Sequence, residues 1–263
     1  MRPGGRRLFR PALAIVAALF FVRGSCGGST RKPVQPGAEA DELASKEARA
    51  FRKDAAAFYG SYKTLSVSFT LKGKVNGEEL YYEGELSSTD KSLKINLKDA
   101  VFLSPLITLE IGKDRVTLKD HARNKTETIP RADYQWVELF GRSFPIRFFE
   151  PLMRGFLPED ALAEDSTFAK TPAGEILVRS YNNSFEAAMY FAEARLKKIF
   201  YRDKVKGEIL IFHLGTPFKN RSYPQTLKIE HSRMNDYLAL TFRGLRVTGS
   251  VATPAGDTPP AKK

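Results

Sequence analysis

The spacing of apolar side chains along the chain changes near residue 62. Before this point, Leu43, Phe51 and Phe58 belong to a set of apolar residues three or four positions apart, which is typical of an amphipathic helix. After it, apolar and polar residues alternate from Leu65 to Leu71, as in a strand with one buried face. Asn76-Gly77 then predicts a tight hairpin turn.

The alternating pattern continues over most of the chain. It returns at Leu80–Leu86, Leu93–Leu97 and Val116–Leu118, and short turns separate the segments. Antiparallel neighbours joined in sequence order are therefore expected. Six later segments carry the same alternation: Glu175–Tyr181, Ala187–Glu193, Leu196–Tyr201, Gly207–Leu214, Thr226–Glu230 and Tyr237–Phe242.

The middle of the chain interrupts this alternation. Apolar residues in Ala132–Phe140 and Pro145–Phe156 recur at helical spacing, and Pro145 and Pro158 bound the second segment. The pattern thus predicts a short helical insert. Because a twisted sheet of about 11 strands tends to curl, the expected fold is mainly β (α+β). It is an unclosed antiparallel half-barrel with an N-terminal helix and a central helical plug.

Curling of the sheet would gather its apolar side chains in one interior. An apolar cavity there could hold acyl chains, because each methylene removed from water is worth about 0.8 kcal/mol. The alternative is that the same side chains only fill the core of a β-rich domain. The candidate lining residues are Leu65, Val67, Phe69, Leu71, Leu93, Ile95, Leu97, Val116, Leu118, Trp136, Phe140, Phe148, Leu152 and Phe156.

The N-terminus has the order of an export signal. Basic residues in segment 1–10 precede an apolar run, Pro11–Val22, and the small residues Gly24 and Ser25 precede Cys26. The apolar run is shorter than the roughly 20 residues that cross a bilayer. The sequence therefore divides into an export signal peptide (1–25), a flexible tether (26–40), one folded domain (41–249) and a disordered tail (250–263).

The charge and cysteine content of the chain limit the classes of partner that it can be expected to bind. The formal charge is +12, but segment 1–25 holds five of the 42 basic residues and none of the 30 acidic ones, so the rest carries +7. This balance suits work beside an anionic membrane surface. No long Lys/Arg block occurs, which argues against nucleic acid as a partner. A single cysteine excludes an internal disulfide framework.

The candidate chemistry is binding rather than catalysis. His121, His213 and His231 lack metal-ligand spacing, and the chain contains no nucleophile elbow, phosphate loop or zinc-protease motif. We therefore expect no enzyme activity, no cofactor and no metal site. Acylated lipoproteins or lipids remain the ligands that an apolar cavity would suit.

Cys26 and the residues before it resemble the lipobox of bacterial lipoproteins. The resemblance implies that the cysteine is acylated, becomes the first mature residue and anchors the protein in a membrane. Arg23 departs from the family pattern, which usually has an aliphatic residue at that position. The alternative is an ordinary secretory signal with an unmodified Cys26.

The folded region resembles the LolB family of outer-membrane lipoprotein receptors, within the wider LolA/LolB-like lipoprotein localisation superfamily. Most of the expected mature chain is covered, and Ser104-Pro105-Leu106 is among its most specific parts. The segments that carry the resemblance are Leu93–Leu106, Leu109–Ile111, Arg115–Leu118, Leu139–Ile146, Leu152–Pro158, Tyr223–Glu230 and the alternating strand Tyr237–Arg243.

This resemblance implies a role in lipoprotein sorting. A lipid-anchored monomer at the outer membrane, facing the periplasm, would accept acylated proteins from a LolA-like periplasmic carrier and insert them into the membrane. The loop Val101–Leu106 matches the family's protruding insertion loop, with Phe102, Leu103 and Leu106 as its apolar tip. The alternative is that Phe102 and Leu106 pack inside the barrel.

Two other functions remain open at this point. The same fold could carry a lipid or glycolipid cargo, or it could serve as a non-catalytic lipoprotein scaffold with a filled interior. The decisive difference is whether the barrel interior can admit an acyl chain.

Overall fold

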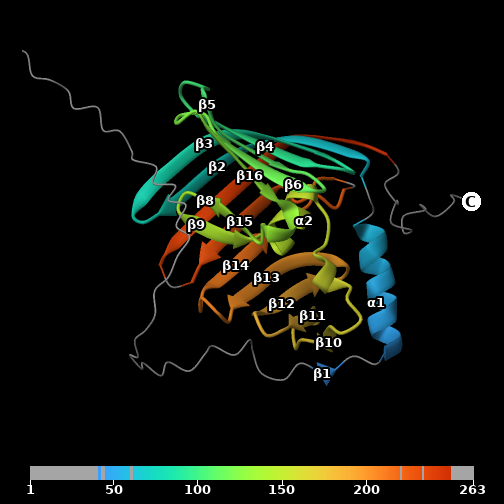
Figure 1. The fold of residues 1–263 in the computed structure, drawn as a ribbon. Coiled ribbons are helices and arrows are strands. Elements are labelled where there is room, and N and C mark those ends of the chain that lie inside the picture. Colours follow the sequence, from blue (N-terminus) through green and yellow to red (C-terminus); the bar gives the residue numbers. More distant parts are fainter. Residues whose placement is uncertain (1–40, 43–44, 60–61, 220, 233, 250–263) are drawn as a thin grey trace, which may run out of the picture.

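The computed structural model describes residues 41–42, 45–59, 62–219, 221–232 and 234–249 (Figure 1). The expected signal peptide, Cys26, the tether and the C-terminal tail lie outside these residues. The helices are α1 (Ser45–Phe58), α2 (Ile146–Arg154) and the 3-10 helices η1 (Arg131–Asp133) and η2 (Glu159–Ala161). The strands are β1 (Asp41–Glu42), β2 (Thr64–Val75), β3 (Glu78–Thr89), β4 (Leu93–Asp99), β5 (Pro105–Ile111), β6 (Arg115–Asp120), β7 (Lys125–Pro130), β8 (Trp136–Leu139), β9 (Arg142–Pro145), β10 (Thr167–Lys170), β11 (Ile176–Tyr181), β12 (Phe185–Ala192), β13 (Arg195–Asp203), β14 (Ile209–Leu214), β15 (Thr226–His231) and β16 (Asp236–Thr248).

Fourteen of these strands form one curled antiparallel sheet that does not close (Figure 1). Its order is β1-β10-β11-β12-β13-β14-β15-β16-β2-β3-β4-β5-β6-β7, so the edges are β1 and β7. The predicted unclosed antiparallel fold is confirmed. The sheet exceeds the expected 11 strands because the short strands β1, β7 and β10 join it, and none of them shows a clear alternation of apolar residues.

The pairing of β16 with β2 joins the two ends of the domain. Their register runs from Tyr237 opposite Lys74 to Thr248 opposite Thr64, with a bulge between Arg243 and Arg246. The strands from β2 to β7 pair in sequence order, and so do those from β10 to β16. Among the described strands, the only other pair of neighbours that is distant along the chain is β1 with β10. The sheet is therefore an open meander in two runs, which the pairing of the first and last long strands, β2 and β16, joins into one sheet.

One connected apolar core lies on the concave side of the sheet. Helix α1 covers part of it, because Phe51 packs edge-on against Phe168 and Phe191, with ring centroids 5.9 and 5.0 Å apart. The predicted helix is thus confirmed, with its described bounds at Ser45 and Phe58. The remaining cover is the segment Trp136–Arg154, hereafter the plug, which consists of β8, β9 and α2.

The expected helix at Ala132–Phe140 is wrong. Only the three-residue η1 is helical there, and the rest of the segment forms the β8–β9 hairpin. Phe140 (φ 54°) and Gly141 (φ 74°) both adopt left-handed backbone conformations, as a two-residue hairpin turn requires. The unusual conformation of Phe140 is compensated by stacking on Tyr82, with ring centroids 5.0 Å apart.

The second predicted insert helix is confirmed as α2. It ends at Gly155 (φ 74°), whose N–H donates to the Leu152 carbonyl at 3.1 Å while the Phe156 N–H donates to the Pro151 carbonyl at 2.8 Å. These two bonds form a Schellman motif, which fixes where the helix stops.

Gly84 in β3 offers a test of the packing on the concave side. A Cβ atom at this position would lie 2.2 Å from the Phe69 ring, which crosses the glycine from the neighbouring strand. We expect Gly84→Ala to displace that ring and lower the free energy of unfolding by about 1–3 kcal/mol. Urea denaturation would measure the loss. The exposed Ser87→Ala on the same strand is the control and should change stability by less than about 0.5 kcal/mol.

Candidate functional site

The interior between the plug and the sheet is apolar and almost filled. Side chains from the plug, including Leu139, Phe149 and Met153, face strand residues across it. A volume of about 20 Å³ remains, enough for about one water molecule. The sheet residues around this gap are Phe69, Leu71, Ile95, Leu97, Ile107, Leu109, Ile229, Leu238 and Leu240.

A much larger cavity of about 760 Å³ lies on the outward side of α2, and we call it the mouth cavity. Its walls come from η1 and the residues after it, from the outward face of α2, from the segment leading into η2, and from β12 and β13. The lining residues are Arg131, Tyr134, Gln135, Trp136, Pro145, Ile146, Arg147, Glu150, Pro151, Arg154, Phe156, Leu157, Glu159, Asp160, Asn182, Ser184, Phe185, Tyr201 and Asp203.

Helix α2 therefore separates two spaces of different character. Its apolar face is buried against the core through Phe148, Phe149 and Leu152. Its other face presents Arg147, Glu150, Arg154 and neighbouring residues to the mouth cavity. The segment is amphipathic, and the polar side looks out of the half-barrel.

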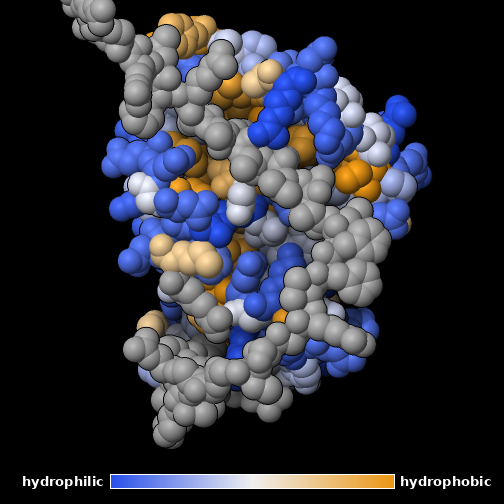
Figure 2. Space-filling view, turned by 60° about the vertical axis from the view of Figure 1, so that its left-hand side comes forward, coloured by the Kyte–Doolittle hydropathy of each residue, from blue (hydrophilic) through white to orange (hydrophobic). Residues whose placement is uncertain are grey.

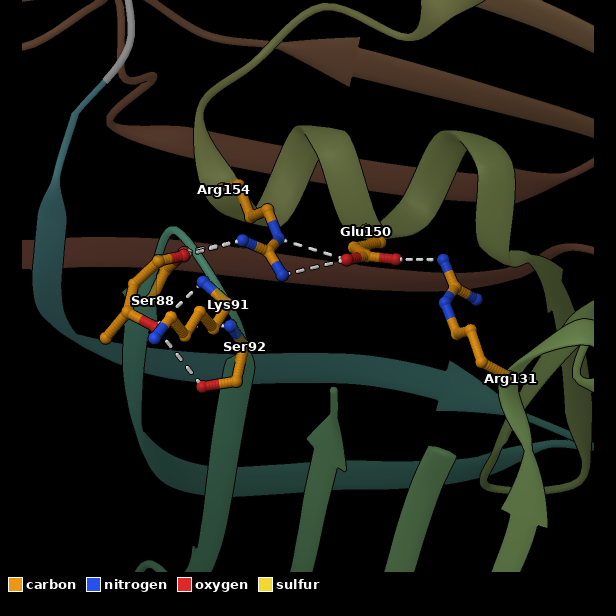
Figure 3. A network of polar contacts seen from close by, with 7 residues as sticks. Ser88, Lys91, Ser92, Arg131, Glu150 and Arg154 are labelled. Atoms are coloured by element: carbon orange, nitrogen blue, oxygen red, sulfur yellow. Dashed lines mark hydrogen bonds and ion pairs between the residues drawn. The ribbon is translucent and has the colours of Figure 1, made fainter. Parts of the chain in front are cut away.

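Glu150 is the centre of an ionic network on the outward face of α2 (Figure 3). One carboxylate oxygen pairs with Arg131, beyond the edge strand β7. The other accepts from Arg154 Nε at 3.0 Å. Arg154 in turn donates from Nη1 to the Thr89 carbonyl at 2.8 Å, at the end of β3. The network thus connects α2 to both the edge of the sheet and one of its central strands.

A second polar contact fixes the start of α2. Arg147 makes a bidentate pair with Asp160 of η2, with distances of 3.0 and 2.6 Å. Asp160 also accepts a bond from Ser180 Oγ at 3.0 Å, so its carboxylate is well satisfied. The guanidinium lies 4.1 Å from the Phe185 ring centroid. The side chain is consequently held although it borders an open cavity.

Aromatic rings form much of one wall of the mouth cavity. Tyr201 packs against Phe148, Phe185 and Trp136, with centroid distances of 5.4, 5.8 and 6.3 Å. Burial raises the pKa of Tyr134 to about 12 and also raises the pKa of Tyr201. Both phenols are therefore neutral near pH 7, and the wall is suited to contact apolar or weakly polar groups.

The sequence-predicted lining residues do come together: eleven belong to one apolar core cluster, and Leu118, Trp136 and Phe156 are partly buried and pack against it. They do not surround one open cavity. Phe69, Leu71, Ile95 and Leu97 line the small interior gap, and Trp136 and Phe156 line the mouth cavity. The other eight pack within the core or, in the case of Leu118, against it: Leu65, Val67, Leu93, Val116, Leu118, Phe140, Phe148 and Leu152.

Sequence reasoning missed the polar residues that hold the plug. Arg147, Glu150 and Arg154 occur three and four positions apart, the spacing that places side chains on one helix face. That signal was available in the sequence. Their partners Arg131 and Asp160 lie in short 3-10 turns with no recognisable pattern, so the pairings themselves could not be foreseen.

The loop between β4 and β5 projects from one end of the sheet, beside the β5 label in Figure 1. Phe102 and Leu103 are 82% and 62% exposed, as the insertion-loop interpretation expects, and Val101 is 78% exposed. Leu106 differs from the expectation, because it is half-buried against the core at the start of β5. The exposed apolar tip is therefore Val101–Leu103.

Within the described residues, no group of three or more His, Cys, Asp and Glu side chains is placed to hold a metal ion. None of the helices in this part of the chain is long and apolar enough to cross a membrane. His213 contacts Glu230 at 3.0 Å on the sheet surface. Several ion pairs join different structural elements, as Arg147 and Asp160 join α2 to η2.

No protein-family model matches the chain, and no curated protein matches it. Solved structures do resemble it in fold. A Vibrio parahaemolyticus domain assigned to outer membrane lipoprotein sorting is 16% identical, with a TM-score of 0.50, covering 76% of this chain and 91% of its own. A DUF1329 family protein from Desulfovibrio piger is 10% identical, with a TM-score of 0.52, covering 76% and 92%. A LolA superfamily protein from Nitrosomonas europaea is 7% identical, with a TM-score of 0.46, covering 77% and 94%.

At these identities the likeness to the Vibrio and Desulfovibrio structures concerns the fold alone. The chain shares the overall architecture of these two structures.

Removing the charge of Glu150 tests how strongly the plug is held. We expect Glu150→Gln to weaken both arginine contacts and to lower the free energy of unfolding by about 1–3 kcal/mol, because the pairs are partly buried. Hydrogen exchange in α2 should accelerate more than in β2. Glu159→Gln is the matched control, since Glu159 borders the same cavity but is exposed. Equal effects of the two substitutions would contradict the proposed anchoring.

Proposed function

We propose that this protein binds the acyl chains of lipids or lipoproteins between the concave side of the sheet and the plug. The observation that carries the proposal is the construction of the plug. It covers an entirely apolar gap on one side and is fastened by ion pairs at an open cavity on the other. The shared fold with a lipoprotein-sorting domain supports the same class of ligand.

Ligand entry requires the plug to move, because the interior gap of about 20 Å³ cannot admit an acyl chain. An entering chain would replace the contacts that Phe149 and Met153 now make with the sheet. Each buried methylene of the ligand contributes about 0.8 kcal/mol, which offsets the apolar contacts that the plug gives up. The ion pairs of Glu150 and Arg147 then decide how readily the plug leaves.

The mouth cavity provides a route for this exchange. Its aromatic wall, including Trp136, Phe185 and Tyr201, borders the outward face of α2. A ligand could rest there with its polar part near Arg131 or Arg147 while its acyl chain passes beneath the helix. No nucleotide or metal is required for a transfer of this kind, since the difference in apolar burial between donor and acceptor drives it.

The specific role that we propose is that of a LolB-like receptor. The protein would be anchored by an acylated Cys26 at the outer membrane, act as a monomer, and receive lipoproteins from a LolA-like periplasmic carrier. The exposed tip Val101–Leu103 supports contact with a membrane. A lipid or glycolipid carrier of the same fold would use the same interior.

One observation favours a different function, that of a non-catalytic scaffold. The interior is nearly filled by the protein's own side chains, as expected for a domain that binds partners only through its surface. The two functions differ in whether the plug opens, which a binding experiment can decide.

Acyl-chain uptake is the test. A chain beginning at Gly27 retains every described residue and lacks the lipidation site. We expect it to bind a fluorescent fatty acid, and Glu150→Gln to bind more tightly, by about tenfold for each 1.4 kcal/mol by which plug opening becomes easier. Glu159→Gln should bind like the parent chain.

The binding measurement separates the two functions. Failure of both the parent chain and Glu150→Gln to take up a fatty acid or an acylated protein would exclude acyl binding and favour the scaffold. Native mass spectrometry of lipid that co-purifies with the protein would distinguish a lipoprotein receptor from a lipid or glycolipid carrier.

A further inference from the structure

Large exposed apolar side chains occur at only one end of the sheet among the described residues. This end, hereafter the turn end, carries the turns that follow β2, β4, β6, β11, β13 and β15. The turns at the opposite end, within the part of the chain that the structure describes, expose no large apolar residue. The exposed set comprises Tyr81, Val101, Phe102, Leu103, Tyr181, Val205, Met234 and Tyr237.

Two turns at this end share one hydrogen-bond pattern, in which an aspartate side chain accepts two backbone N–H groups. Asp99 Oδ1 accepts the backbone N–H groups of Val101 and Phe102, both at 2.8 Å. Asp203 Oδ1 accepts those of Val205 and Lys206, both at 2.7 Å. In each turn the residue two positions after the aspartate is a valine, and the two valines are 78% and 81% exposed. These hydrogen bonds fix the backbone of both turns, and the valine side chains at the tips point into solvent.

A third exposed apolar residue, Met234, lies in the β15–β16 turn between these two. The β13–β14 and β4–β5 turns are six strand spacings apart in the sheet order, on the order of 30 Å along the curled rim. Three tips, Val101–Leu103, Val205 and Met234, are therefore distributed around the turn end. Because the sheet is curled, they do not fall on one line and together can contact a plane.

Cations accompany the apolar residues. Lys72 Nζ lies 5.3 Å from the Tyr81 ring centroid, and Lys228 Nζ lies 5.2 Å from that of Tyr237. The chain order Lys204-Val205-Lys206 places a lysine on either side of the second tip. Meanwhile the carboxylates of the two turn aspartates bond backbone N–H groups. Figure 2, in which this side of the molecule comes forward, shows orange patches set among hydrophilic side chains.

This pattern fits a lipid bilayer better than a folded protein partner. A protein interface needs one contiguous complementary patch, whereas separate protruding tips can each enter a fluid surface. Lysines beside exposed tyrosines and valine favour an anionic surface, where a lysine without a carboxylate partner contributes about 1 kcal/mol. Lys228 also pairs with Glu230, so its contribution is smaller. The formal charge of +7 that the chain carries outside segment 1–25 has the complementary sign.

We propose that the turn end is a three-point docking surface for an anionic bilayer. This extends the membrane contact of the single tip Val101–Leu103 in the proposed function, but it does not depend on acyl binding. Docking through the turn end also sets the orientation of the protein relative to the bilayer. Asn182, Ser184 and Asp203, which line the mouth cavity, lie in or beside turns at this same end, next to Tyr181 and Val205. The docked protein therefore brings one side of the mouth cavity against the lipid surface.

Vesicle co-sedimentation tests the docking surface with the chain beginning at Gly27. We expect binding to phosphatidylcholine vesicles that contain about a third phosphatidylglycerol, weaker binding to pure phosphatidylcholine, and weakening by salt. Val205→Asp, Met234→Asp and Phe102→Asp should each reduce affinity about tenfold. Ala173→Asp changes the charge equally at an exposed position of the opposite end and should bind like the parent.

The outcomes separate docking from acyl binding. Loss of vesicle affinity in the three tip variants, with fatty-acid uptake in solution unchanged, supports the docking surface. Absence of binding to either vesicle, or an equal loss in Ala173→Asp, overturns it and leaves the acyl-binding proposal standing. An effect confined to Phe102→Asp also overturns the three-point arrangement, because a single loop would then account for the contact. Circular dichroism of each variant confirms that it is folded.

Discussion

A curled antiparallel sheet that does not close leaves one apolar concave side, and covering this side is the constraint on which the rest of the structure depends. The protein meets it with α1 and with the plug. The plug is the more consequential cover, because burial of Phe148, Phe149 and Leu152 holds it from inside while the pairs of Glu150 and Arg147 hold it from outside. Apolar burial is non-directional, so an acyl chain can substitute for it. The ion pairs depend on geometry and give the cover a defined closed position.

The fold was largely predictable because alternation of apolar residues is a strong signal wherever a strand has one buried face. Leu65–Leu71 and Asn76-Gly77 illustrate this, since both the strand and its turn occur as expected. The β8–β9 hairpin was misread because Trp136, Leu139 and Phe140 are spaced as in a helix, and the turn at Phe140-Gly141 is stabilised by a distant ring, Tyr82. Sequence spacing within a short apolar segment does not record such a contact.

The site was predictable only in part. The fourteen apolar residues lie in or against one core cluster, but the space among them is taken by the plug, and volume left after packing is not a property of any sequence segment. The open cavity instead arises where η1, α2, η2 and the β12–β13 pair meet. Its charged residues come from regions far apart in the chain, and their pairing follows from the tertiary structure.

The pairing of β2 with β16 has a consequence for how this protein comes to be folded. Each of the two strands has one neighbour nearby in the chain, but they find each other only after the whole domain has been made. Until then β2 offers an open edge, and the core beneath it cannot be completed. Contacts between such distant segments form slowly. A chain built in this way cannot complete its sheet until β16 has been synthesised, so its apolar core is finished later than in a fold whose strands all pair in sequence order.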